Sequence, residues 1–296
     1  MKRVIITGGS GFVGSNTIPL LEEKGYEVIN FDLKEGFDVR KRYQLKNVIK
    51  KGDKVLHLAA IARFAEADEN PLLAFETNYE GTKNVAEVCK ENGAERLVYS
   101  STGSVYMPID EEPPIKETFK AKGNSVYACT KFAAEEAIRK SGMKHIILRY
   151  AHLYGEGKVG HGAIGGFISR MSRGLAPILY GGKQSNDFTY VKDIALANLT
   201  ALEIDKEEAF NQAYNIGTGE ELTTEEVFNI LADRFDYHKE FEKFPIRTVD
   251  PLRFMFDVSK AEQVLGFKAK YNFKDGLDDY LKVGTIPGWI NRDGKA

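Results

Sequence analysis

The feature that most constrains this chain is the regular alternation of strand-like and helix-like segments over its first 150 residues. Short runs rich in β-branched residues are followed by longer helical patterns that end at glycine. We predict strands over residues 3–7, 26–31, 54–58, 96–100 and 145–150, and helices over 11–24, 71–92 and 125–140. Strands that alternate with helices in this way favour a doubly wound α/β fold, in which helices cover both faces of a parallel sheet. Ligands of such folds bind beyond the carboxyl ends of the strands.

The second half of the chain has a different texture. Six glycines between residues 155 and 166 indicate a mobile loop, and further elements are predicted as helices over 167–173, 192–203 and 223–235 and strands over 178–180 and 213–216. Thr223 and Glu226 have the spacing of a helix capping box. We therefore expect one domain from residues 1–154 plus a returning stretch near 184–217. Residues 155–183 and 218–296 are expected to form a smaller mixed α/β domain.

Composition excludes several classes of protein. The 41 Lys and Arg residues are balanced by 43 Asp and Glu, so the net charge of −2 lacks the basic excess of a nucleic-acid-binding protein. No apolar run approaches the ~20 residues that span a bilayer, which argues against a membrane protein. Two cysteines, Cys89 and Cys129, are too few for a disulfide framework or a four-cysteine zinc site. Both are expected on buried helix faces, in a cytoplasmic protein without a metal site.

A glycine-rich turn links the first strand to the first helix. Gly8, Gly11 and Gly14 are spaced so that a diphosphate can approach the backbone amides at the helix N-terminus. The alternative is a tight turn without a ligand, but the strand before it and the helix after it favour a dinucleotide site. Asp32 follows the second strand, 18 residues after Gly14. A carboxylate at this position accepts hydrogen bonds from the ribose hydroxyls and repels a 2′-phosphate. Asp32 therefore favours NAD over NADP, while the nearby Lys34 weakens this preference. The alternative is that Asp32 is an ordinary turn residue without a ligand.

Tyr127 and Lys131 form a Y-x-x-x-K pattern on a predicted helix. Positions i and i+4 share a helix face, so an ammonium beside the phenol is expected to lower the tyrosine pKa. Such a phenol can exchange a proton with a sugar hydroxyl. A run of hydroxyl residues from Ser100 to Tyr106 ends the fourth strand, and one of them is needed to hold the substrate oxygen. Turn and capping chemistry is the alternative for Ser100 and Ser104.

Together these motifs resemble the extended short-chain dehydrogenase/reductase family, in its branch of NAD-dependent sugar-nucleotide epimerases and dehydratases. The UDP-glucose 4-epimerases are the nearest type, and the resemblance extends over nearly the whole chain. Further matching stretches include Asp38-Val39, His57 to Ala60, Asn78 to Thr82, Leu148 to Gly155, Asp187 to Ala195 and Asp257 to Ala261. The resemblance implies a Rossmann-type NAD-binding domain and a smaller substrate-binding domain.

The resemblance also implies roles for individual residues. Thr102 takes the catalytic Ser/Thr position, Tyr127 is the general acid/base, and Lys131 holds the nicotinamide ribose. The residues expected to bind NAD are Gly8, Gly11, Phe12, Val13, Gly14, Asp32, Asp38, Val39, Leu58, Ala59, Ala60, Asn78, Ser100, Ser101, Tyr127, Lys131 and Tyr150. The residues expected to bind a nucleoside-diphosphate sugar are Thr102, His152, Tyr180, Asn186 and Arg247.

Departures from the family pattern narrow the chemistry. His152 stands where the family usually has Asn, and Asn186 where it usually has Arg, which weakens the inference of a nucleotide-sugar substrate. Gly103 and Ser104 follow Thr102 in place of the acidic pair of the dehydratases, so dehydration is disfavoured. The expected function is an NAD-dependent epimerase. The alternatives are a dehydrogenase or reductase of a keto sugar or related substrate, and a non-catalytic dinucleotide-binding protein. By resemblance, the helices over 71–92 and 125–140 would form a four-helix bundle in a homodimer.

Overall fold

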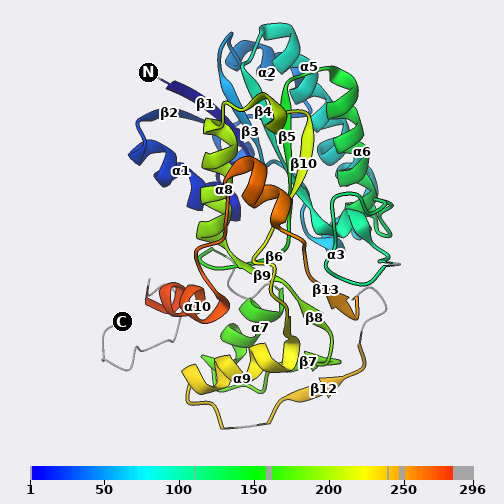
Figure 1. Cartoon of the computed structure of the whole chain (residues 1–296), viewed down its shortest axis with the longest axis vertical. Helices are drawn as coiled ribbons and strands as arrows, with labels where there is room; N and C mark the ends of the chain where they lie inside the picture. Colours follow the sequence, from blue (N-terminus) through cyan, green and yellow to red (C-terminus); the bar gives the residue numbers. More distant parts are fainter. Residues whose placement is uncertain (1, 110, 158–161, 239, 247–250, 283–296) are drawn as a thin grey trace.

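The computed structural model, which describes residues 2–109, 111–157, 162–238, 240–246 and 251–282, has a six-stranded parallel sheet at its centre (Figure 1). Its strand order is β10-β5-β4-β3-β1-β2. The strands are β1 (Lys2–Thr7), β2 (Tyr26–Phe31), β3 (Lys54–His57), β4 (Arg96–Thr102), β5 (His145–Tyr150) and β10 (Gln212–Ile216). This order, with β1 next to the switch point, confirms the predicted Rossmann-type sheet. β10 comes from the stretch predicted to return to the first domain, whose boundaries stay a prediction.

Helices cover both faces of this sheet. α1 (Phe12–Glu23) and α8 (Val191–Glu203) pack together on one face, while α2 (Arg42–Val48), α5 (Thr82–Asn92) and α6 (Val126–Ser141) cover the other (Figure 1). Because successive strand residues point to opposite faces, β1 feeds two cores. Val4 and Ile6 pack in the core with Ile194 of α8, and Ile5 packs in the other core with Val85 of α5. The sheet is therefore buried on both sides.

The predicted helix over residues 71–92 is interrupted. α3 (Phe64–Glu69) and α4 (Pro71–Ala74) lead into a π-helical segment, η2 (Phe75–Gly81), before α5 begins at Thr82. Within η2 the Asn78 carbonyl accepts a 2.6 Å hydrogen bond from the Thr82 hydroxyl, while the Asn78 side chain bonds the backbone of Ile61. The Asn78 side chain thus ties η2 to Ile61, and π-helical turns of this kind are frequent near functional sites.

The second part of the molecule contains short strands and three longer helices. β6 (His152–Tyr154) pairs with β9 (Phe188–Tyr190), β7 (Ile178–Tyr180) with β12 (Glu242–Phe244), and β8 (Ser185–Asn186) with β11 (Leu222–Thr223) and β13 (Arg253–Phe254). The helices are α7 (Gly162–Met171), α9 (Thr224–Arg234) and α10 (Phe273–Lys282). Short helical turns complete the chain: η1 (Leu33–Glu35), η3 (Gly103–Tyr106), η4 (Glu207–Ala209) and η5 (Ala261–Leu265). An aromatic-rich core lies among α7, α9, α10 and β9.

Several local predictions are settled by the structure. The capping box of Thr223 and Glu226 is confirmed at the start of α9. The mobile loop predicted up to residue 166 is wrong over its second half, because α7 begins at Gly162. Buried apolar residues recur at helical spacing there (Ile164, Phe167, Ile168, Met171) and outweigh the poor helix propensity of glycine. Cys129 is exposed rather than buried. None of the described helices is long and apolar enough to span a bilayer.

Candidate active site

One cavity of about 1300 Å³ runs between the carboxyl ends of the central strands and the second part of the molecule. It is lined by every residue predicted to bind NAD except Asn78, and by Thr102, His152, Tyr180 and Asn186 of the predicted substrate site. Arg247 lies outside the described residues. The structure thus brings most residues of both predicted sites to the wall of a single cavity.

The glycine-rich turn forms one end of this cavity. A Cβ on Gly8, whose φ is +72°, would lie 2.7 Å from the Ala59 backbone. A Cβ on Gly14 would lie 2.4 Å from the carbonyl oxygen of Gly9. Gly11 is the N-cap of α1, and no side-chain capping hydrogen bond is made there. A diphosphate could therefore accept hydrogen bonds from the first turn of α1, and the cradle fits a dinucleotide.

Carboxylates follow the glycine turn along the wall. Asp32, at the end of β2, accepts hydrogen bonds from the backbone amides of Ser10 (3.1 Å) and Lys34 (2.9 Å). Asp38 is buried and pairs with Arg40 at 2.7 Å, and this hydrogen bond holds the pKa of Asp38 below its usual value. Arg40 also lines the cavity and was not predicted. Its position two residues after Asp38 could have indicated that it lies at the same site.

Asn78 supports the wall of the cavity from behind. Its Oδ1 accepts a hydrogen bond from the Ile61 amide at 2.7 Å. Its Nδ2 donates to the Ile61 carbonyl and to the Thr130 hydroxyl of α6, both at 3.1 Å. The side chain is fully buried, and it ties the 58–61 segment to α6. In this structure its contacts are those of a positioning residue.

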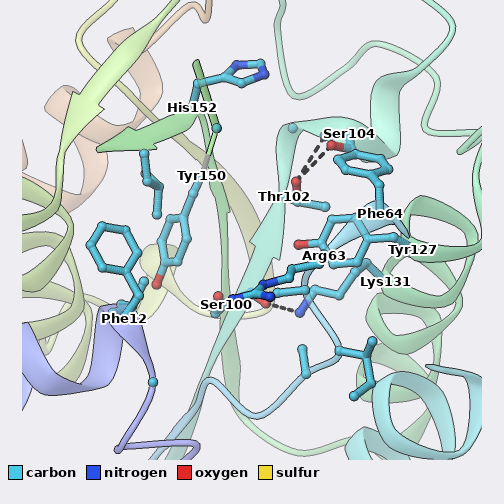
Figure 2. A pocket seen from close by; sticks show the side chains of 18 of the residues that line it. Phe12, Arg63, Phe64, Ser100, Thr102, Ser104, Tyr127, Lys131, Tyr150 and His152 are labelled. Atoms are coloured by element: carbon cyan, nitrogen blue, oxygen red, sulfur yellow. Dashed lines mark hydrogen bonds between the residues drawn. The ribbon is translucent and has the colours of Figure 1, made fainter. Parts of the chain in front are cut away.

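Thr102, Tyr127 and Lys131 meet near the middle of the cavity (Figure 2). Thr102 ends β4, and its hydroxyl is 3.2 Å from both the amide and the hydroxyl of Ser104. Tyr127 and Lys131 project from the first two turns of α6, whose N-cap is Ser125. The Lys131 ammonium donates a hydrogen bond to the Ser100 carbonyl and lies 4.3 Å from the centre of the Tyr99 ring.

The protonation of these groups differs from the prediction. Burial raises the pKa of Tyr127 to about 12, and a hydrogen bond with Thr102 opposes this only partly. Burial also lowers the pKa of Lys131 to about 7. The expected lowering of the tyrosine pKa is therefore wrong for the site as it stands. The Lys131 ammonium is directed at the Ser100 carbonyl, and burial disfavours its charged form.

Residues that the sequence did not single out complete this region. The Phe64 ring of α3 meets the Tyr127 ring edge-on, with centroids 5.2 Å apart. Arg63, just before it, also extends into the cavity (Figure 2). On the opposite wall Tyr150 donates a 2.6 Å hydrogen bond to Asn198 of α8, which fixes its ring. Phe64 and Arg63 belong to no recognisable sequence motif. Only the folded structure brings them close to Tyr127.

The far end of the cavity belongs to the second part of the molecule. The His152 ring meets Phe254 edge-on at 5.1 Å, and Tyr180 pairs with Phe244 at 5.6 Å. Asn186 lies in the middle strand of a small sheet. Arg170 of α7 also reaches this end and bonds the Ala176 carbonyl. Among the described residues, no group of three or more His, Cys, Asp or Glu side chains could hold a metal ion.

Comparisons with known proteins agree with this geometry. The profile of the NAD dependent epimerase/dehydratase family matches residues 4–217. A Methanocaldococcus jannaschii protein provisionally named UDP-glucose 4-epimerase is 33% identical over 303 residues, covering 93% of this chain and 95% of the relative. The structure of Thermotoga maritima UDP-glucose 4-epimerase with UDP-glucose has a TM-score of 0.87 at 28% identity and covers 95% and 99% of the two chains. That of Thermus thermophilus UDP-glucose 4-epimerase with NAD has a TM-score of 0.85 at 30% identity, with 96% and 100% covered.

Proposed function

This chain belongs to the NAD dependent epimerase/dehydratase family, and from that premise we propose that it is an NAD-dependent epimerase of nucleotide sugars, of the UDP-glucose 4-epimerase type. One observation carries the proposal: Thr102, Tyr127 and Lys131 lie between a glycine cradle at one end of a single cavity and a second, partly aromatic chamber at the other. This arrangement places the proton-transferring groups where a dinucleotide and a sugar would meet.

The chemistry asked of the protein is proton exchange at a sugar hydroxyl. NAD, when bound in the glycine cradle, would supply the group that accepts and donates the hydride. Tyr127 takes the proton as the hydroxyl becomes a ketone and gives it back when the ketone is reduced on its other face. Thr102 orients the same oxygen. A charged Lys131 favours the phenolate form of Tyr127, which burial alone disfavours.

Substrate and cofactor selection are assigned to the two ends of the cavity. Asp32 favours NAD, since its carboxylate would repel a 2′-phosphate at that place. His152 and Asn186, with Arg170 nearby, are proposed to bind the diphosphate of a nucleoside-diphosphate sugar. These residues support the proposal by lining the chamber beyond Thr102, even though two of them replace the family's usual Asn and Arg.

We further propose a cytoplasmic homodimer. Leu72 and Phe75 are exposed on the segment that lies beside α6, where a bundle of two helical pairs would cover them. Both cysteines are free thiols, as is usual in a reducing compartment.

The proposal is tested by incubating the purified protein with UDP-glucose, UDP-galactose and UDP-N-acetylglucosamine, with catalytic amounts of NAD. We expect interconversion of C4 epimers without net consumption of the cofactor. Tyr127→Phe should lower kcat by about 10²–10⁴-fold with little loss of NAD affinity. Steady consumption of one NADH or NADPH per turnover would show that the protein is a reductase and not an epimerase. Failure on every nucleotide sugar offered would contradict the proposal.

A further inference from the structure

A buried carboxylate lies directly behind Lys131. Glu135 is one helical turn further along α6, and its side chain is fully buried. It accepts hydrogen bonds from Ser101 at 2.6 Å and from Arg149 at 2.9 and 2.6 Å. A further bond comes from Arg139 at 2.9 Å. A buried ion pair with this many partners is costly to desolvate and is weak evidence for stability by itself.

The position of Glu135 connects it to the reacting groups. Tyr127, Lys131 and Glu135 follow one another at i+4 spacing and share one face of α6. Lys131 bonds the carbonyl of Ser100, and Glu135 bonds the hydroxyl of the next residue, Ser101. α6 therefore fixes two successive residues of β4, immediately before Thr102.

The charged and titratable groups that face Glu135 come from four elements. Lys131 and Arg139 lie on α6, Arg149 and His145 on β5, Tyr99 on β4, and Tyr106 on η3. Arg149 also donates to the Tyr106 hydroxyl at 2.7 Å. Burial would raise the pKa of Glu135, but the hydrogen bonds and positive charge of Arg149, together with the Ser101 hydrogen bond and the charge of Arg139, outweigh this and keep the pKa below its usual value. The carboxylate is thus ionised at neutral pH, and it is the charge that opposes the loss of the Lys131 proton.

We propose that Glu135 is a positioning residue: its carboxylate, one turn beyond Lys131 on α6, stabilises the Lys131 ammonium, and its bond to Ser101 aligns the end of β4 with Tyr127. Its consequence for catalysis rests on the proposed function, because only a reaction that uses Tyr127 requires the neighbouring ammonium. Its effect on Lys131 does not depend on any substrate.

The test is Glu135→Gln in the full chain, which keeps an acceptor for Ser101 and removes the charge. Lysine labelled with ¹³C at Cε reports the titration of Lys131 by NMR, with the signal assigned from Lys131→Met. We expect the midpoint of Lys131 to fall by at least about one pH unit. The high-pH limb of kcat should move by the same amount. Glu135→Asp should keep the midpoint near that of the unmodified protein.

The matched control is Glu136→Gln, which removes the same charge from the neighbouring, partly exposed position paired with Arg139. It should leave the midpoint unchanged. If Glu135→Gln does not fold, the double variant Glu135→Gln/Arg149→Met removes both buried charges. It is expected to show a smaller downward shift, because the loss of the Arg149 charge partly offsets the loss of the carboxylate. An unchanged midpoint in whichever variant folds would overturn the inference. Absence of epimerase activity in the unmodified protein would refute the proposed function while leaving the NMR test intact.

Discussion

Replacing Gly14 by alanine is expected to destabilise the protein although alanine is the better helix former. Gly14 lies in α1, where its backbone conformation is ordinary and helix propensity favours alanine by about 0.8–1.0 kcal/mol. The added Cβ would lie 2.4 Å from the Gly9 carbonyl oxygen and 2.5 Å from the Gly9 Cα, against an ordinary contact of 3.4–4 Å. The glycine turn would have to move by about 1 Å.

The expected magnitude follows from these two opposing effects. Overpacking of this kind costs about 1–3 kcal/mol, so the variant should lose up to about 2 kcal/mol of unfolding free energy after the gain in propensity. Because the displaced backbone carries the amides of the cradle, NAD affinity should fall at least about tenfold, or about 1.4 kcal/mol. Urea unfolding followed by circular dichroism and calorimetric titration with NAD measure the two effects.

Gly166→Ala provides the matched comparison within another helix. A Cβ at Gly166 of α7 meets nothing within 4 Å, so this variant should gain about 0.5–1 kcal/mol and bind NAD as before. If both variants gain stability and both bind NAD normally, the close approach at Gly14 does not constrain the turn, and the reasoning is refuted.

Further predictions concern stability and assembly. Lys131→Met should raise the free energy of unfolding at pH 7 by a few kcal/mol. The pKa of Lys131 in the folded protein, about 7, lies below its ordinary value of 10.5, so protonated Lys131 destabilises the folded state. This destabilisation is complete below pH 7 and decreases as the pH rises to 10.5. Urea unfolding at pH 7 and 10 should show the gain shrinking, and a gain that grows with pH would contradict the assignment. Thr223→Ala should cost about 1 kcal/mol by removing the capping box of α9, measured by thermal unfolding. Leu72→Glu combined with Phe75→Glu should convert the proposed dimer to a monomer in sedimentation velocity; an unchanged mass would place the interface elsewhere.

Sequence patterns predicted the features that local chemistry determines. The six strands of the central sheet and the helices α1, α5, α6 and α8 follow from short-range periodicity, whereas α2 and α3 were not predicted. The glycine turn needs only residues 8–14 and the element on either side. The same holds for Tyr127 and Lys131, because one helical turn is enough to bring them together. These features carry the fold and most of the candidate site.

Features that depend on distant partners were missed. In the π-helical segment η2, Asn78 forms hydrogen bonds with Ile61, 17 residues away in the chain. The raised pKa of Tyr127 follows from burial that is created only when α3 and β4 pack around it. Glu135 lies at a recognisable spacing from Lys131, yet its partner Arg149 comes from another strand, so the pair is visible only in the folded chain.

The late arrival of β10 has a consequence for synthesis on the ribosome. β5 is buried along its whole length, and its outer edge pairs with β10, in register from Ile146 opposite Gln212 to Tyr150 opposite Ile216. About sixty residues separate the two strands, so a nascent chain that has folded its first five strands exposes an unpaired apolar edge until residue 216 leaves the exit tunnel. Such an edge is a template for pairing between chains. Translation pauses or truncations between residues 150 and 216 are therefore where aggregation of this protein should concentrate.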